Sequence, residues 1–306
     1  MNSKIVIGGI IALIVVVAVV MFATNRTASP TLPASGATPN VVVAENFWGS
    51  LAGQIGGNRI HLTSIVTDPN ADPHDYEATA DDARAVADAD YVVENGAGYD
   101  TWMDKLLGAE NKSGRVVLTI ATLVGKKEGD NPHLWYNPAY VNAAAQQMEK
   151  DLASLDPADA SYFESQYASL QTSLAGYQNE IASIKTNYPN VPVGSTEDIF
   201  VYLAEAAGLN LTTPPAFIQA VGDGNDPPAA SVATFQDQIN RKQIRVLVYN
   251  VQTDTPITEN IKSLAEKNGI PVVSISETLQ PVGASFQDWM GSEVSALDQA
   301  LASASR

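Results

Sequence analysis

Two of the three histidines in this chain stand in the same short sequence frame. His74 lies in the segment DPHDYE and His133 in the segment NPHLWY, and each is followed two residues later by an aromatic side chain. Proline restricts its own backbone and the residue before it, and an Asp or Asn side chain can bond nearby backbone. Each frame therefore predicts a rigid loop that holds an imidazole outward. Neutral imidazole is the commonest protein ligand for transition metals, so the pair predicts half of a metal site. Two unrelated loop histidines are the alternative.

The chain contains no cysteine, which limits the chemistry of such a site. Disulfides, thiolate metal sites, iron–sulfur clusters and a cysteine nucleophile are all excluded, as is a lipidated cysteine anchor. Any metal must be held by imidazole, carboxylate, carbonyl or water.

The composition describes an acidic globular protein of 306 residues, long enough for about two domains. The net charge of -17 argues against a nucleic-acid partner, because phosphates require clustered Lys and Arg. An acidic field attracts cations weakly, but solubility alone accounts for this charge.

The N-terminal segment predicts an extracytoplasmic location. Residues 5–23 form an uncharged apolar run long enough to span a bilayer as a helix. Residues 24–39 are rich in Pro, Ser, Thr and Ala and predict a tether without a core-forming pattern. The run is expected to be either a retained anchor or a cleaved signal, and in both cases the folded part lies outside the cytoplasm.

From residue 40 onward, short apolar β-branched runs alternate with amphipathic stretches, which predicts parallel β-α-β units. The expected strands are residues 41–44, 60–66, 91–93 and 116–120, then 191–193, 209–212, 244–249 and 272–275. The expected helices are residues 46–56 and 79–88, then 198–207, 229–241, 258–268 and 285–303.

Between these two sets, residues 157–185 carry apolar side chains at spacings of three and four, which predicts one long helix. The predicted fold class is therefore α/β, with two lobes that are each a mainly parallel sheet flanked by helices, joined by one long interlobe helix. We expect an N-terminal lobe at residues 40–156, a linking helix at 157–187 and a C-terminal lobe at 188–306. A linking helix should limit hinge opening.

Further ligands are expected where strands of the second lobe end, because open α/β sheets bind ligands at the carboxyl ends of their strands. Glu197 follows the strand at 191–193, and Asp254 follows the strand at 244–249. The structural alternative for Glu197 and Asp198 is stabilisation of a helix N-terminus, and for Asp254 it is an N-cap. His61 lies inside a strand pattern and is expected to be a strand-edge residue.

The segments DPHDYE, NPHLWYNP, GSTEDIF and VYNVQTDTP, in this order and with a long helix between the lobes, resemble the zinc/manganese-type (cluster A-I) solute-binding proteins of bacterial ABC transporters. The resemblance extends from about residue 40 to the C-terminus. It implies that two histidines of the first lobe meet a His or Glu and an Asp of the second lobe around an ion in the cleft. Carried over by motif, the ligands are His74, His133, Glu197 and Asp254.

The chain departs from the pattern in three places. Asn131 replaces the usual Asp before the second Pro-His, a change that should leave the loop geometry intact. The segment VGKKEGD stands where many zinc-type members carry a His-rich loop. Asp254 is matched only through its spacing to Pro256, and Asp198, Asn250 or a water could take its place.

The resemblance implies an extracytoplasmic, monomeric binding protein that captures Mn²⁺ or Zn²⁺ and delivers it to an ABC permease in the membrane. Imidazole and carboxylate suit both ions, and a glutamate that binds through both oxygens would favour Mn²⁺. A metal-dependent adhesin or another non-transport surface protein on the same fold is the alternative function. No HExxH or GxSxG motif is present, so an enzyme is not expected.

Overall fold

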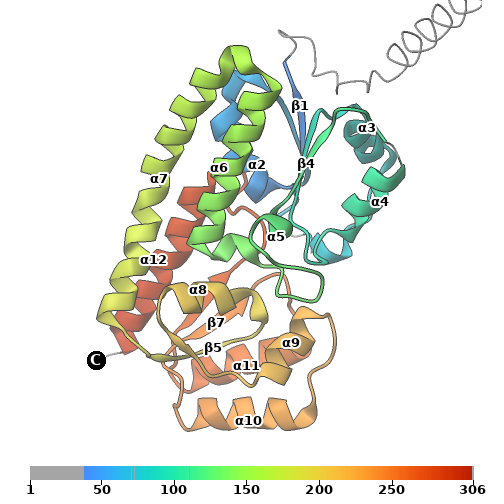
Figure 1. The fold of residues 1–306 in the computed structure, drawn as a ribbon. Helices are drawn as coiled ribbons and strands as arrows, with labels where there is room; N and C mark the ends of the chain where they lie inside the picture. The colour runs from blue at the N-terminus through green and yellow to red at the C-terminus, as the bar shows by residue number, and fades with distance from the viewer. Residues whose placement is uncertain (1–37, 70, 72, 110, 305–306) are drawn as a thin grey trace, which may run out of the picture.

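The computed structural model describes residues 38–304 apart from residues 70, 72 and 110, and it contains two parallel four-stranded sheets (Figure 1). The apolar run at residues 5–23 and nearly all of the expected tether lie outside the described residues. Within the described part, no helix is both long and apolar enough to cross a membrane.

The first sheet has the strand order β2-β1-β3-β4. Its strands are β1 (Asn40–Glu45), β2 (His61–Val66), β3 (Tyr91–Glu94) and β4 (Val116–Thr119). In β1, Val41 and Val43 pack into the core on the side of helix α2 (Asn46–Gly56), whereas Val42 and Ala44 face a second apolar cluster. Both faces of this sheet are covered, which explains why β1 reads as a continuous apolar run rather than an alternating one.

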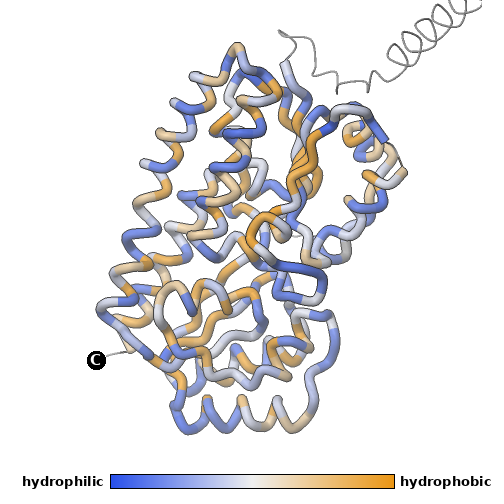
Figure 2. The backbone as a smooth tube through the Cα atoms, in the orientation of Figure 1, coloured by the Kyte–Doolittle hydropathy of each residue, from blue (hydrophilic) through white to orange (hydrophobic). Residues whose placement is uncertain are grey.

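The second cluster lies beneath helices α3 (Ala80–Asp88) and α4 (Thr101–Ala109), which cover the outer face of the first sheet (Figure 1). Thr79 begins α3 with a capping box, because its hydroxyl accepts from the Asp82 backbone N–H while the Asp82 carboxylate accepts from the Thr79 N–H. In Figure 2 the backbone of the buried strands is largely orange, the colour of hydrophobic residues.

The second sheet has the order β6-β5-β7-β8, with all described pairs parallel. Its strands are β5 (Pro192–Ser195), β6 (Asn210–Leu211), β7 (Leu247–Asn250) and β8 (Val272–Ile275). The helices of this lobe are α8 (Val201–Ala206), α9 (Pro215–Gly222), α10 (Ala229–Asn240) and α11 (Pro256–Lys267).

Helix α7 (Ala160–Asn187) runs from one lobe to the other, as Figure 1 shows in yellow-green. It packs against α6 (Pro138–Leu155), α2 and the C-terminal helix α12 (Phe286–Ala304). The apolar positions that predicted this helix are buried in it, except Tyr167, which is only partly buried. The predicted two-lobe α/β fold with a long connecting helix is confirmed.

The observed elements differ from the expected ones mainly at their ends. The expected helix at 198–207 begins as a 3-10 turn (Asp198–Phe200) and becomes α-helical only at Val201. Ile244 and Val246 are buried but precede the strand, which starts at Leu247. The ranges expected from the sequence did not include helices α4, α6 and α9 or the short α5 (Ile120–Leu123).

A buried carboxyl pair links the first sheet to the loop that faces the second lobe. Glu45 ends β1 with no exposed surface, and neither of its carboxyl oxygens accepts a hydrogen bond from a described donor. Burial raises its pKa well above the usual range, and the nearby Asp100 and Glu94 raise it further. Burial and the neighbouring Asp100 carboxyl group therefore keep Glu45 as a neutral acid. Asp100 in turn accepts the backbone N–H groups of Asn95 and Gly96, at 2.6 and 2.8 Å.

Glu45→Gln is expected to stabilise the protein, and more so at high pH. An acid whose pKa is raised by folding stabilises the fold fully below its unfolded pKa and loses that contribution as pH rises toward the folded pKa. A glutamine at this position is neutral at every pH, so it places no buried charge beside Asp100 as pH rises. The gain in unfolding free energy should grow by up to about 1.4 kcal/mol per pH unit above the unfolded pKa.

Urea unfolding at pH 5 and pH 7.5 measures this difference. Glu266→Gln, at an exposed position on α11, is the matched control and should change stability little at either pH. A loss of stability in Glu45→Gln, or a gain that is the same at both pH values, would contradict the buried neutral acid.

Candidate metal centre

The loop that carries His74 leaves the carboxyl end of β2 and is bonded to the second lobe. A 3-10 turn (Pro73–Asp75) presents the imidazole. The carbonyl of Ala71 accepts the Gln252 side-chain amide at 2.8 Å, and the carbonyl of Pro69 accepts the Thr278 hydroxyl at 3.3 Å. The first predicted frame is thus a loop at the lobe boundary. The His74 side chain is 26% exposed there.

The loop that carries His133 is held by Asn131, the departure from the expected Asp. Asn131 donates its side-chain N–H to the carbonyl of Asp198 at 2.7 Å, which turns its oxygen toward His133. That oxygen accepts the His133 backbone N–H at 2.9 Å and lies 3.0 Å from Nδ1. Because the acceptor faces Nδ1, Nε2 of this fully buried ring is the nitrogen that can bind a metal once it has lost its proton. Asn131 thus holds this loop through both ends of its side-chain amide.

Glu197 enters from the second lobe, two residues after β5 ends. Its side chain is fully buried, and Oε2 accepts the Asn250 amide at 2.5 Å and the Thr253 hydroxyl at 2.8 Å. The other oxygen, Oε1, lies 3.4 Å from His133 Nε2. Neither Oε1 nor that nitrogen has a hydrogen-bond partner within the described chain. Glu197 therefore presents one unused oxygen to the first lobe.

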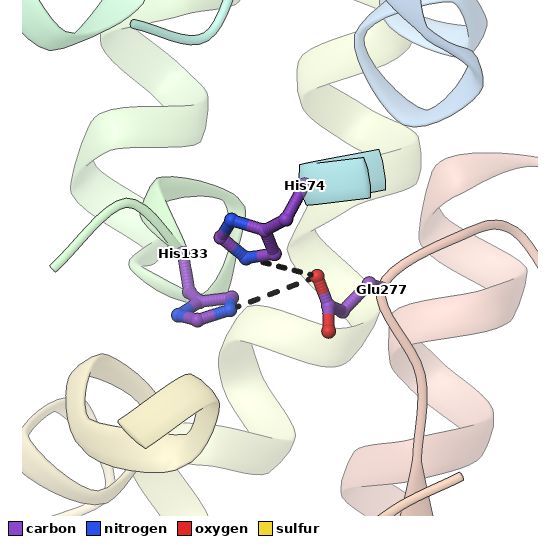
Figure 3. Close-up of side chains that lie close together, drawn as sticks. All are labelled: His74, His133 and Glu277. Carbon is purple, nitrogen blue, oxygen red and sulfur yellow. Dashed lines mark ion pairs between the residues drawn. The ribbon is translucent and has the colours of Figure 1, made fainter. Parts of the chain in front are cut away.

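Glu277 is the residue that the sequence reasoning missed. It lies two residues after β8 ends and is fully buried. Its Oε1 accepts the Asn250 amide at 2.8 Å, and its Oε2 accepts the Tyr99 hydroxyl of the first lobe at 2.9 Å. Figure 3 shows both imidazoles directed at Oε2, which lies 3.6 Å from His74 Nε2 and 3.8 Å from His133 Nε2. The available signal was positional, because Glu277 follows its strand as Glu197 follows β5.

Asp254 is not brought to this cluster. It is exposed and lines an open cleft of about 920 Å³, together with His74 and Asp198. The helix that follows is capped by Thr255, whose hydroxyl accepts the Thr258 backbone N–H, so Asp254 is not the N-cap either. Asp198 lies on the other side of the ring, with Oδ1 3.3 Å from His133 Nδ1. His61 is exposed on the edge strand β2.

The convergent atoms form two overlapping groups that could hold a metal. His74, His133 and Glu277 offer one ligand atom each within 4.8 Å of one another, and so do His133, Glu197 and Asp198. The contacts of 3.4 to 3.8 Å between nitrogens and oxygens are at or beyond hydrogen-bond length. A tetrahedral zinc ion with bonds of about 2.1 Å sets neighbouring donors about 3.4 Å apart. The donor types and their spacing therefore fit a divalent ion.

A proton on His133 offsets part of the negative charge of the cluster when no metal is bound. Burial alone would lower the pKa of His133, but Glu197 and Glu277 outweigh it and raise that pKa well above the usual value. Burial acts to raise the pKa of Glu277, yet His133 and His74 lower it to about 2. We therefore assign a protonated His133 beside an ionised Glu277 near neutral pH.

Comparison with known proteins identifies the family and finds solved structures with the same fold. The family model described as zinc-uptake complex component A, periplasmic (ZnuA) matches residues 41–300. The manganese ABC transporter substrate-binding lipoprotein PsaA of Streptococcus mitis is 24% identical over 257 residues, which are 78% of this chain and 80% of that protein.

Two solved structures share the fold. The periplasmic zinc-binding protein TroA of Treponema pallidum has a TM-score of 0.74 at 19% identity, covering 88% of this chain and 100% of that one. A mutant structure of the laminin-binding adhesin Lmb of Streptococcus agalactiae has a TM-score of 0.72 at 18% identity, covering 86% and 99%.

Metal affinity is expected to fall as pH falls, because an ion must displace the proton that His133 holds. With a raised pKa, that proton is still bound at pH 7, so the apparent affinity should rise about tenfold per pH unit between pH 6 and 8. Competition with a chromophoric chelator measures the affinity. Calorimetry in two buffers of different ionisation heat counts the protons released, and an affinity independent of pH would rule out this protonation state.

Proposed function

We infer the function of this chain from its family: it belongs to the zinc-uptake complex component A periplasmic family, and it is a solute-binding protein of a metal ABC transporter. We propose that it captures Mn²⁺ or Zn²⁺ between its lobes and delivers the ion to a membrane permease. Mn²⁺ and Zn²⁺ are the ions in the names of the relatives PsaA and TroA.

The ligand set that we propose is His74, His133, Glu197 and Glu277. The observation that carries it is the approach of buried imidazole nitrogens of one lobe and buried carboxylate oxygens of the other to 3.4–3.8 Å. Two carboxylates neutralise the charge of a divalent ion, and two imidazoles add nitrogen donors of intermediate hardness. Glu277 takes the place that the family resemblance assigned to an Asp, and Asp254 stays outside the first coordination shell.

Capture begins in the open cleft above the buried donors. The acidic side chains lining this cleft include Glu128, Asp130, Asp223, Asp226 and Asp254, and no Lys or Arg lines it. Such a lining concentrates cations at the entrance. The hydrated ion then exchanges water for the two imidazoles of the first lobe, and the two glutamates of the second lobe complete the shell.

Release requires the lobes to separate, because each contributes half of the donors. We propose the division made from the sequence, with lobes at residues 40–156 and 188–306 and a linker at 157–187. The unbroken helix α7 spans this linker and packs along helices of both parts, so we expect a small opening rather than a wide hinge motion. An opening that breaks the Tyr99–Glu277 bond would loosen one ligand directly.

The protein acts outside the cytoplasm, and we propose that the apolar run at residues 5–23 tethers or exports it. PsaA is named a lipoprotein, but this chain has no cysteine to carry a lipid. We propose a monomer that has no nucleic-acid partner and no catalytic activity, because a closed set of four protein ligands leaves no position for a substrate. Adhesion is the alternative role that we propose, because Lmb, which shares this fold, is named a laminin-binding adhesin.

Glu277→Ala and His74→Ala are each expected to lower Mn²⁺ and Zn²⁺ affinity at least a hundredfold, because each removes a direct ligand. Asp254→Ala is the matched control, since it removes a carboxylate from the same cleft and should change affinity less than about threefold. Titration calorimetry on the metal-stripped protein measures both, with thermal unfolding to check the fold. A hundredfold loss in Asp254→Ala with unchanged binding in Glu277→Ala would restore the ligand set expected from the sequence.

A further inference from the structure

We propose that Asn250 sets the coordination number of the site. By donating one N–H to each glutamate of the second lobe, it leaves each of them a single oxygen for the ion, so the site selects ions that accept four ligands. This inference rests on the proposed function and deepens it, because it assigns the choice between Zn²⁺ and Mn²⁺ to a residue that does not itself touch the metal.

The Asn250 side chain is fixed in one orientation. It ends β7 with no exposed surface, and its Nδ2 donates to Glu197 Oε2 at 2.5 Å and to Glu277 Oε1 at 2.8 Å. Its Oδ1 accepts the backbone N–H of Gln252 at 3.1 Å. Turning the amide over would place its oxygen against two carboxylates, so both N–H groups stay committed to the glutamates.

Glu197 cannot readily bind an ion through both oxygens. Its Oε2 accepts from Asn250 and also from the Thr253 hydroxyl, at 2.8 Å. Only Oε1 faces His133. If Glu197 bound an ion through both oxygens, Oε2 would have to leave its two donors. The buried Asn250 amide would then keep an unpaired N–H, which costs free energy.

Glu277 has one donor on each of its oxygens. Its Oε1 accepts from Asn250, and its Oε2, which faces both imidazoles, accepts from the Tyr99 hydroxyl of the first lobe. The Gln252 side-chain oxygen accepts the Glu277 backbone N–H, which also positions the main chain at this residue. The two glutamates and the two histidines therefore offer four donor atoms in total.

Four donors at a tetrahedral spacing suit Zn²⁺ better than Mn²⁺. Zinc is satisfied by four ligands, whereas manganese favours octahedral sites rich in oxygen. Asn250 carries no charge, so it limits the glutamates without adding a third negative charge to the pair. The wild-type protein should therefore prefer Zn²⁺ over Mn²⁺ by more than the general difference in affinity that nitrogen and oxygen sites show for these two ions.

The test compares the full chain, purified in detergent and stripped of metal, with three variants. Asn250→Ala releases both glutamates. Thr253→Val removes one of the two donors to Glu197 and disturbs the core less, because Thr253 is only partly buried. Asn268→Ala is the matched control, since the same side chain is lost from the same lobe at a position that bonds Asn240 and the Leu264 carbonyl.

Two readouts are needed: Zn²⁺ and Mn²⁺ affinities, and the coordination number of each bound ion from X-ray absorption. In Asn250→Ala we expect the Zn²⁺:Mn²⁺ affinity ratio to fall about tenfold and the manganese coordination number to rise above that in wild type. Thr253→Val should shift the ratio in the same direction by less, and Asn268→Ala should match wild type.

Equal loss of affinity for both ions in Asn250→Ala, with unchanged coordination numbers, would overturn the inference and leave Asn250 a merely structural residue. If Asn250→Ala fails to fold, Thr253→Val decides, and an unchanged ratio and coordination number there would count against the inference. A wild-type protein that binds neither ion would instead overturn the proposed function.

Discussion

The burial of two carboxylates at the lobe boundary is the constraint on which the rest of this structure depends. Removing an ionised carboxylate from water costs several kcal/mol unless a positive partner and hydrogen-bond donors replace the water. Glu197 and Glu277 are fully buried and belong to the same lobe, so their compensation must come partly from the other one. The first lobe supplies it through two imidazoles and the Tyr99 hydroxyl.

This requirement ties the architecture to the site. All of these groups lie in loops that follow parallel strands, which is where both sheets expose unpaired backbone and can carry polar side chains. The carboxyl ends of the strands in the two sheets must face each other for the groups to touch. Helices α7 and α12 pack together along the side of the molecule and hold that arrangement (Figure 1). The proton assigned to His133 supplies one positive charge beside the two glutamates in the metal-free state, whereas a divalent ion supplies two.

The sequence predicted the fold and three of the four proposed ligands for identifiable reasons. The frames around His74 and His133 are local, and Glu197 stands in a motif shared with a known family. Glu277 was missed because no local pattern marks it, and only its place after a strand distinguishes it from other acidic residues. Asp254 was chosen by its spacing to a proline, but the chain turns there so that Asp254 faces the open cleft. Hydrogen bonds between residues distant in sequence, such as those of Asn250, have no signature in a single sequence.

The metal preference shows why residue types alone are insufficient. A glutamate beside histidines adds a hard oxygen donor, and it can bind an ion through one oxygen or both. From the residue types alone, this favours Mn²⁺. In the folded chain the second oxygen of Glu197 is already bonded to Asn250 and Thr253, so the option is removed by neighbours rather than by the ligand itself. Ligand identity sets which ions can bind, whereas the donors behind the ligands set how many oxygens remain for them. Selectivity in this site is therefore a property of the buried hydrogen-bond network as much as of the four residues that would touch the ion.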